Sequence, residues 1–451
     1  MEIDRRAPNY AELCRTFRWQ VPERYNIARD ICGRWADERS RFALYYEEES
    51  GFTSAHTFWD IQREANRLSN VLAALGTLAG DRVAVALPQR PEAAIAHVAI
   101  YQMGAIAVPL SPHCRPAALE HRLGDSAAHL VILDQVAQPT LAQIHQRLPQ
   151  LRHVIGVAAA DGAGIKPWAE VLEHASPRYT ALETGASDPA IIVYPRTATG
   201  GGAKGVVMAQ RTLLGKLSAY VCAHDFLPQA RDLFWSPAGW GSAGGLWNVL
   251  LPTWHFGLPL LAYNGRFEAA RVFDLMERYG VRNSFLSPAE LTMMMQAVAD
   301  PRAIYDLDLR TLASAGEPLG ETVLHWASEK LGVTINQLSA HDAMSGVFGG
   351  GAPRWPAKPG AMGRAFPGHR VAVVDGQGKE LPPGEVGELA VHRQCWGEDD
   401  PVVMLGYWQD AAVTAGAFVG DGWVLTGELA RMDEEGYFWQ AAPKRCGAVI
   451  A

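Results

Sequence analysis

The segment Tyr194-Pro195-Arg196-Thr197-Ala198-Thr199-Gly200-Gly201-Gly202-Ala203-Lys204 follows the apolar run Ile191-Ile192-Val193 and has the composition of a phosphate-binding loop. Glycines let backbone N–H groups approach phosphate oxygens, and threonine hydroxyls add further donors. Lys204 would bring a positive charge to the same anion. The candidate phosphate-binding residues are therefore Thr197, Thr199, Gly200, Gly201, Gly202 and Lys204.

The spacing of this segment excludes one class of nucleotide-binding protein. A Walker loop requires glycine, four residues, then Gly-Lys-Ser/Thr, and the segment does not have that spacing. A glycine-rich stretch can also be an ordinary flexible turn, and composition alone favours that interpretation. The rest of the sequence has to decide between the two.

The wider sequence resembles the adenylate-forming superfamily, the acyl-CoA synthetases and their relatives. The resemblance includes Lys204-Gly205-Val206-Val207 and the segment from Gln210 to Gly215 after the loop. It recurs in order along nearly the whole chain, at residues 65–70, 80–85, 104–110, 235–245, 312–320, 406–408, 423–429 and 433–437. Among subfamilies, the sequence is most similar to acetyl- and medium-chain-type acyl-CoA synthetases.

The resemblance implies an α/β fold, the layered N-terminal domain of that superfamily, with two α/β subdomains and a smaller β-rich subdomain. Periodicity agrees, because helical spacing from Trp59 to Leu75 is followed by the apolar run Arg82 to Leu87, and such alternation predicts stacked layers with ligands at strand ends. From about Arg364, glycine and proline turns separate short β runs. We expect a first α/β subdomain, a second with the phosphate loop and acid pocket, a β-rich subdomain and a hinge remnant, over residues 1–185, 186–363, 364–440 and 441–451. The family's small C-terminal domain, which delivers a catalytic lysine, is expected to be absent from this chain.

The implied chemistry joins a carboxylic acid to ATP, releases pyrophosphate and passes the acyl group of the adenylate to coenzyme A. ATP, Mg²⁺ and CoA are therefore the implied cofactors, and a small carboxylic acid or acyl ligand is the implied partner. A carboxylate has to approach a polyanionic phosphate chain, so the site must neutralise charge. Loop donors, a lysine and a magnesium ion would supply that field.

Two further groups of site residues are implied by the resemblance. The turn that lines the adenine pocket and the segment that holds the ribose correspond to Gly316, Glu317, Pro318, Ser339 and Glu428. The segment that shapes the acid pocket corresponds to Trp240, Gly241 and Gly245. For Trp240, packing in the protein core is an equally good interpretation.

The sequence departs from the family pattern where the chemistry is most demanding. In the loop, Pro195, Arg196 and Ala198 interrupt the usual wording. Where the family has an aromatic residue, Gly, a variable residue, Thr and Glu, this chain has Ser339-Ala340-His341-Asp342-Ala343. Serine cannot stack on adenine, and Ala343 offers a metal ion no oxygen. No metal ligand is assigned; Asp342 is a weak substitute candidate, because a shift of one residue in an extended segment reverses the side chain's direction.

Two functional hypotheses follow. The first is an ATP-dependent acyl-activating enzyme that resembles an acid–CoA ligase. The second is a non-catalytic homologue that binds an acyl or nucleotide ligand, or a protein partner. The substitutions at Ser339, Ala340, Asp342 and Ala343 favour the second for adenylation itself, and fold alone cannot separate the two.

Composition and charge restrict the other possibilities. The 451 residues are 48% hydrophobic and 20% charged, which is typical of a globular protein with several subdomains. A formal charge of -8 argues against a nucleic-acid partner or an anionic membrane, although local basic patches remain compatible with it. The six cysteines are scattered, so we expect reduced thiols in a cytoplasmic protein, with no zinc site. No apolar stretch approaches a membrane span.

Overall fold

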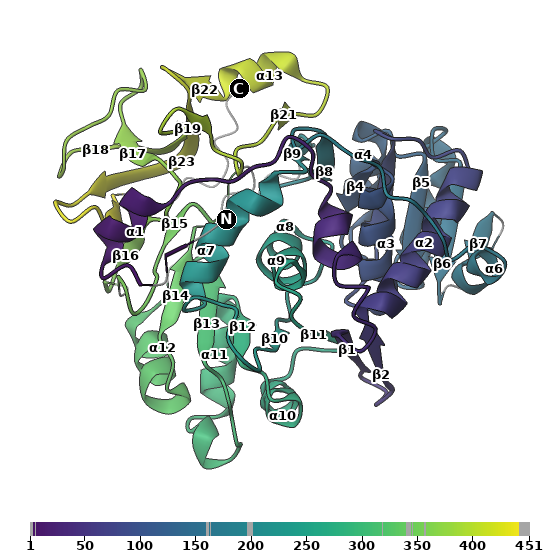
Figure 1. Ribbon diagram of the computed structural model, residues 1–451, viewed down its shortest axis with the longest axis horizontal. Coiled ribbons are helices and arrows are strands. Elements are labelled where there is room, and N and C mark those ends of the chain that lie inside the picture. The colour runs from purple at the N-terminus through teal and green to yellow at the C-terminus, as the bar shows by residue number, and fades with distance from the viewer. Residues whose placement is uncertain are drawn as a thin grey trace.

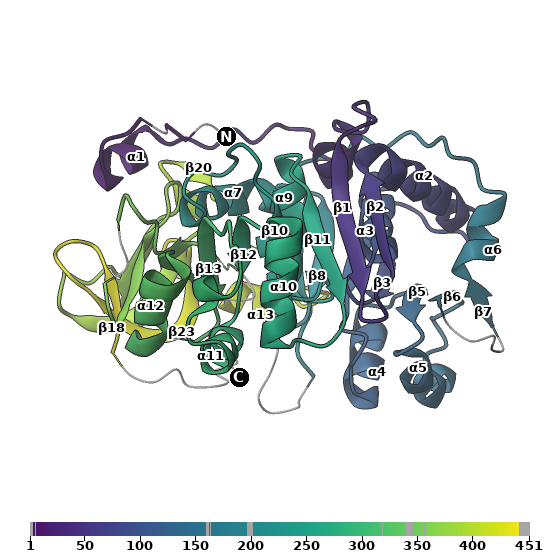
Figure 2. The ribbon, with the colours of Figure 1, turned by 90° about the horizontal axis from the view of Figure 1, so that it is seen from below.

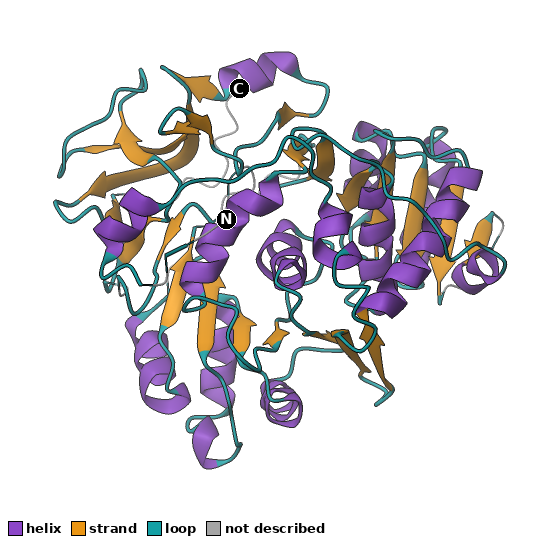
Figure 3. Cartoon of the chain, viewed as in Figure 1, coloured by secondary structure: helices purple, strands orange, loops and turns teal. Residues whose placement is uncertain are grey.

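The computed structural model describes residues 3–4, 6–158, 162, 164–195, 202–317, 319–339, 344, 346–355 and 358–441. These residues form two large β-sheets with helices around and between them (Figure 1). Helices and strands alternate along much of the chain, as Figure 3 shows. The structure therefore confirms the predicted α/β class.

The first sheet has eight strands in the order β21-β9-β8-β4-β3-β5-β6-β7. Neighbouring strands from β8 to β7 are parallel, whereas β9 pairs antiparallel with both β8 and β21. The strands span Arg82–Ala86 (β3), Ile106–Pro109 (β4), Leu130–Asp134 (β5), His153–Val157 (β6), Ile165–Pro167 (β7), Pro189–Val193 (β8), Val206–Ala209 (β9) and Gly406–Tyr407 (β21). The helices around this sheet are Phe58–Ala74 (α2), Pro91–Gln102 (α3), Pro116–Asp125 (α4), Gln138–Ile144 (α5) and Trp168–Glu173 (α6).

Both faces of the first sheet are covered, which explains why its strands are apolar at nearly every position. Val83 and Val85 belong to the core that includes α2 and α3, whereas Ala84 and Ala86 pack in a second core with α4 and α5. A strand buried on both faces needs a continuous apolar run, because successive side chains point to opposite faces. The apolar run Arg82 to Leu87 therefore predicts β3 to within one residue.

The second sheet has fourteen strands. Its order is β17-β18-β23-β24-β16-β15-β14-β13-β12-β10-β11-β1-β2, with β22 beside β23. Strands β10 to β14 and β1 are parallel in the middle of this path. Their bounds are Phe42–Glu48 (β1), Thr53–Thr57 (β2), Phe234–Trp235 (β10), Leu260–Asn264 (β11), Asn283–Phe285 (β12), Thr311–Ala315 (β13) and Ile335–Leu338 (β14).

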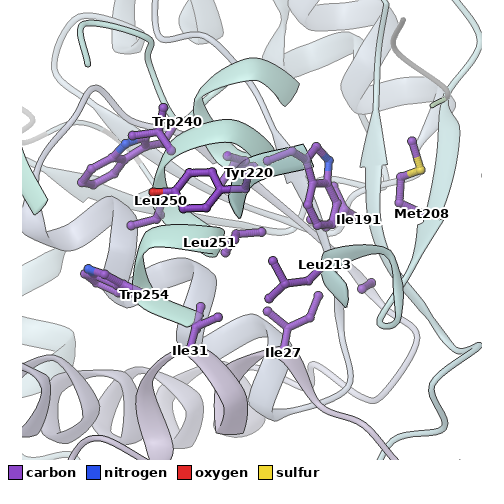
Figure 4. Close-up of a cluster of buried hydrophobic side chains, with 14 of the residues drawn as sticks. Ile27, Ile31, Ile191, Met208, Leu213, Tyr220, Trp240, Leu250, Leu251 and Trp254 are labelled. Atoms are coloured by element: carbon purple, nitrogen blue, oxygen red, sulfur yellow. The ribbon is translucent and has the colours of Figure 1, made fainter. Parts of the chain in front are cut away.

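Helices cover the two faces of this parallel part differently. One face packs against α10 (Ala269–Tyr279), α11 (Pro288–Ala297) and α12 (Glu321–Trp326), which Figure 2 shows in front of the strands. The other face packs against α7 (Thr212–Ala223), whose twelve residues are all buried, and α9 (Leu251–His255). Trp240, Tyr220 and Leu213 lie in this shared core between the two sheets (Figure 4). The two lobes, each built around one of the sheets, are therefore packed together by buried helices.

The remaining strands give the C-terminal part its β-rich character, as the glycine and proline turns predict. They are antiparallel and span Phe348–Gly349 (β15), Ala361–Ala365 (β16), Val371–Val374 (β17), Val386–His392 (β18), Phe418–Val419 (β22), Trp423–Met432 (β23) and Phe438–Gln440 (β24), with a separate hairpin of Gln394–Cys395 (β19) and Glu398–Asp399 (β20). The other helical segments are Tyr10–Thr16 (α1), Ala243–Gly245 (α8), Ala411–Gly416 (α13), the π-helical turns Arg29–Gly33 (η1), Leu246–Leu250 (η3) and Ala327–Leu331 (η5), and the 3₁₀ turns His145–Arg147 (η2) and Pro301–Ala303 (η4).

Sheet membership does not follow the division expected at residues 185 and 186. Strands β8 and β9 lie after that position but complete the first sheet, and β1 and β2 lie before it but extend the second. The two sheets therefore exchange strands across the expected boundary.

Two further expectations from the sequence concern membrane-spanning helices and cysteines. In the described part of the chain, no helix combines the length and apolar character that crossing a membrane would require. Five cysteines are free thiols, and three of them, Cys32, Cys222 and Cys395, are buried; Cys446 lies outside the described residues.

Candidate active site

The candidate phosphate loop connects β8 to β9, whose pairing of Val193 with Val206 closes its base. Thr197, Thr199, Gly200 and Gly201, with Arg196 and Ala198, lie outside the described residues, so the structure places only the two ends of the loop. Gly202 and Lys204 are described.

Helix α4 holds both ends of the loop. The Tyr194 hydroxyl donates a hydrogen bond of 2.7 Å to the Asp125 carboxylate, and the His121 ring lies 2.9 Å from the Ala203 carbonyl oxygen through Nε2. Burial, followed by the neighbouring Asp125 carboxylate, raises the pKa of the Tyr194 hydroxyl, so it remains a donor. A Cβ atom at Gly202 would lie 2.5 Å from the His121 ring, so a larger residue at this position would require that ring to shift.

Lys204 already has a carboxylate partner in the structure. Its ammonium group forms an ion pair with the Asp410 carboxylate, which also accepts a hydrogen bond of 2.9 Å from the Val413 amide at the start of α13. The side chains are 43% and 24% exposed, so solvent and ions reach the pair. Sequence reasoning missed Asp410, although its place before a short helix is a typical N-cap position.

A second set of predicted residues converges on one cavity of about 200 Å³. We call it the strand-end pocket; its lining includes Gly316, Glu317, Ser339 and Glu428. The parallel strands β13 and β14 end side by side, with Ala315 opposite Leu338, and the chain turns at Gly316 with a φ of +119°. Pro318 lies outside the described residues. The structure thus brings together four of the five residues assigned to adenine and ribose.

Strand β23 supplies the opposite wall through a β-bulge. Its pairing with β18 shifts register around Leu389, where the Thr426 hydroxyl donates a hydrogen bond of 2.7 Å to the Leu389 carbonyl oxygen. Gly427 has a φ of +73°, and its amide donates to the Glu388 carboxylate over 2.8 Å. Thr426 and Glu428 both line the pocket from this irregular strand.

The interior of the strand-end pocket is largely apolar with a few polar groups. Leu338, Met344, Phe348 and Met362 line it alongside the buried Ser314. The Ser314 hydroxyl has no hydrogen-bond partner among the described residues. An unsatisfied hydroxyl on an apolar wall can serve a ligand, since a buried polar group without a partner is unfavourable.

Ser339 has a structural task that the sequence did not reveal. Its hydroxyl oxygen accepts hydrogen bonds from the amides of Gly346, Val347 and Phe348 at 3.1, 3.0 and 3.3 Å. It therefore joins the end of β14 to residues 346–348 at the start of β15. The side chain lines the pocket but its oxygen is engaged by the backbone.

Of the residues assigned to the acid pocket, Trp240 lies in the core between the two sheets, and none of the three lines the strand-end pocket. Trp240 is buried, and its indole N–H has no partner within the described part of the chain. A Cβ atom at Gly241 would overlap the Leu110 carbonyl group at the end of β4, and one at Gly245 would overlap that of Gly239. Gly241 therefore permits close backbone packing against the first sheet, and Gly245 permits it within its own segment.

The carboxylate considered as a metal ligand, Asp342, follows β14 in the sequence. Asp342 and Ala343 lie outside the described residues. Across the described ranges, no group of three or more His, Cys, Asp and Glu side chains is placed to hold a metal.

The chain is similar to a known protein family, to curated relatives and to solved structures. Residues 34–408 match the family model described as AMP-binding enzyme. The chain is 30% identical to an acetyl-coenzyme A synthetase of Bacillus subtilis (strain 168), over 97% of this chain and 77% of the relative. An acyl-CoA synthetase structure from Brucella canis superposes with a TM-score of 0.87 at 26% identity, covering 96% of this chain and 79% of that one. An anthranilate CoA ligase in complex with anthranoyl-AMP superposes with a TM-score of 0.82 at 23% identity, covering 94% and 78%, and supports the fold.

Proposed function

The chain belongs to the AMP-binding enzyme family, and on that basis we propose that it holds the adenosine part of ATP in the strand-end pocket and activates a carboxylic acid there. The family activity is ATP-dependent formation of an acyl-adenylate and transfer of the acyl group to CoA, and the relatives are acyl-CoA synthetases and CoA ligases. The observation that supports the proposal most directly is the convergence of Gly316, Glu317, Ser339 and Glu428 on one pocket.

The pocket's own groups suit the parts of a nucleoside. Leu338, Met344 and Phe348 offer apolar contact to a planar base, and the Ser314 hydroxyl can exchange a hydrogen bond with the base's polar edge. Glu428 can accept hydrogen bonds from ribose hydroxyls, which are strong when the acceptor is charged. We place the phosphates toward Lys204 and the loop residues Thr197, Thr199 and Gly200 to Gly202.

We also propose that Mg²⁺ binds mainly through the nucleotide's phosphates, because this ion usually takes only one or two protein carboxylates. Bound there, it would neutralise phosphate charge. Asp342 is the candidate carboxylate, and Trp240, Gly241 and Gly245 remain the candidates for the acid's surroundings. The free thiols favour a reducing compartment, so we propose a cytoplasmic location.

A second candidate function is nucleotide or acyl binding without turnover. The ion pair of Lys204 with Asp410 favours it, because the lysine that would meet phosphate is already neutralised. The engaged hydroxyl of Ser339 points the same way, since it leaves no aromatic surface and no free oxygen at that position.

The test measures acid-dependent pyrophosphate release from ATP with Mg²⁺ over short, medium-chain and aromatic acids, together with the thermal shift produced by ATP. Glu428→Gln should lower ATP affinity by about tenfold, because a charged acceptor is lost. Glu385→Gln, an exposed turn carboxylate outside the pocket, is the matched control. A thermal shift without pyrophosphate release would favour the second function, and the absence of both would refute nucleotide binding.

A further inference from the structure

A separate cleft of about 740 Å³ lies between η1 with its following turn, the first half of α2, and residues 177–181. We call it the arginine cleft, and its lining includes Arg29, Arg34, Arg39, Arg63, Arg178 and Trp59. It shares no lining residue with the strand-end pocket. Five arginines around one cleft are unexpected in a chain with a formal charge of -8.

Carboxylates within the protein satisfy some of these arginines and leave others available. Arg34 pairs with Asp30 at 2.7 Å, and Arg63 pairs with Glu64 at 2.9 Å. Arg29 faces Glu183 at 3.5 Å, with both side chains more than half exposed. Within the described residues, Arg39 and Arg178 have no carboxylate partner within 4 Å. The available positive charge in the cleft therefore comes from these two, against the single lining carboxylate of Asp37.

Two of the guanidinium groups contact the same ring, that of Trp59. The Arg39 and Arg63 guanidinium carbons lie 5.0 and 4.6 Å from the centre of the same indole ring. Each contact with the ring is favourable, but two like charges on one ring repel each other. An anion bound in the cleft would weaken that repulsion and would meet planar donor groups of fixed geometry.

The third wall, which presents Arg178, is held rigidly on α2. The Asn66 side-chain amide donates to the Pro177 carbonyl oxygen, and the Asn70 amide donates to those of Ser176 and Arg178, at 2.9 to 3.0 Å. The Gln62 amide donates to Asn66 and to the buried Gln102, at 2.8 and 2.9 Å, and these amides line the cleft floor. Arg178 therefore projects from a backbone segment that is held in place, which lowers the entropy lost on binding.

We propose that the arginine cleft is a binding site for an anion that carries two or more phosphate groups. Arg39 and Arg178 supply the uncompensated charge, Arg63 and Arg29 supply further donors, and the acidic remainder of the surface disfavours an extended nucleic acid. A phosphate chain carries more negative charge and more acceptor oxygens than a single carboxylate, so it can satisfy several guanidinium groups at once. Helix α2, which lines the cleft, lies in the lobe built around the first sheet (Figure 1), and the site is independent of the proposed acid activation.

Titration calorimetry with inorganic tripolyphosphate, at constant ionic strength and without Mg²⁺, tests the proposal on the full chain. Arg39→Gln with Arg178→Gln should weaken binding at least about tenfold, since two charge-assisted contacts are removed. Arg152→Gln, at an exposed arginine outside the cleft, should leave the affinity unchanged. Thermal unfolding of the variants checks that these exposed substitutions leave the fold intact.

Because tripolyphosphate can also enter the candidate phosphate loop, hydrogen exchange locates the binding site. If the anion binds in the arginine cleft, it should slow hydrogen exchange in peptides that cover residues 33–41 and 175–182. This protection should be lost in the double variant and retained in Lys204→Ala. Non-saturable binding, equal affinity in the double variant and the wild type, or protection confined to the loop region would each overturn the proposal.

Discussion

Lys204 and Asp410, 206 positions apart in the sequence, form an ion pair that ties the candidate phosphate loop to the start of α13. The same stretch is joined by backbone pairing of β21 with β9 and by the bond from the Trp408 amide to the Gly205 carbonyl oxygen, at 2.7 Å. An anion that reaches the loop must therefore compete with Asp410 for the lysine. Before any phosphate binds, Lys204 is therefore already paired with a carboxylate.

Asp410→Asn should strengthen ATP binding. Asparagine keeps the N-cap of α13 but removes the charge that competes for Lys204. A partly exposed ion pair contributes about 0.2–1 kcal/mol, so the expected gain is at most about fivefold in affinity. Calorimetry with ATP measures it, and Lys204→Ala should bind more weakly than the wild type with little change in unfolding temperature. Weaker ATP binding by Asp410→Asn would show that the carboxylate helps to build the site.

Gly241→Ala should destabilise the junction of the two lobes. Its Cβ atom would overlap the Leu110 carbonyl group, which is backbone and cannot move aside easily, so we expect a loss of about 1–3 kcal/mol in the free energy of unfolding. Gly239→Ala is the matched control, because nothing lies within 4 Å of the added atom. Denaturant titration of both variants gives the comparison. Similar stabilities would mean that the backbone contact at Leu110 relaxes freely.

Much of the fold was predictable because its strands and helices are locally encoded. The run Arg82 to Leu87 predicts β3, and the helical spacing from Trp59 to Leu75 predicts α2. Each element leaves a periodic pattern in its own sequence, because its apolar residues lie on the faces that become buried. The exchange of β1 and β2 into the second sheet was not predictable. Strand pairing between distant segments depends on the tertiary fold and leaves no periodic signal in either segment.

The candidate site divides in the same way. Gly316, Glu317 and Glu428 were identified by resemblance, and the structure brings them to one pocket. The partner of Lys204 and the three amides bound by Ser339 were missed, because side-chain partners 206 and seven to nine positions away follow from folding rather than from spacing. The arginine cleft was equally hidden, since its charges come from three separate segments.

Ser314→Ala and Ser339→Ala should separate ligand binding from stability within one pocket. The Ser339 oxygen serves three amides, so its loss should lower the free energy of unfolding by about 1–3 kcal/mol. The Ser314 hydroxyl is buried without a partner among the described residues, so its removal should leave stability unchanged or slightly higher. Denaturant unfolding with and without ATP measures both effects. We expect Ser314→Ala to lose part of the stabilisation by ATP, and an unchanged ATP effect would show that this hydroxyl does not meet the nucleotide.

Acid should destabilise the protein through two buried histidines. Burial lowers the pKa values of His97 and His224 to about 3, and for His224 the nearby Arg310 adds to the effect. The folded state therefore keeps both rings neutral below the unfolded-state pKa of about 6.5, where the unfolded chain binds protons. Stability is fully present above about pH 6.5 and falls as the pH decreases toward 3, by up to about 1.4 kcal/mol per pH unit for each ring.

His224→Gln tests this contribution directly. Between pH 7 and pH 5, its free energy of unfolding should fall by about 2 kcal/mol less than that of the wild type, since one buried titrating group is gone. His174→Gln, at a histidine whose side chain is 91% exposed, should follow the wild-type decrease. Urea titrations at pH 7 and pH 5 give the decrease in the free energy of unfolding for each protein. Comparing these decreases does not depend on the variant's stability at pH 7. Parallel decreases in all three proteins would mean that the His224 ring takes up its proton in the folded state as readily as in the unfolded one.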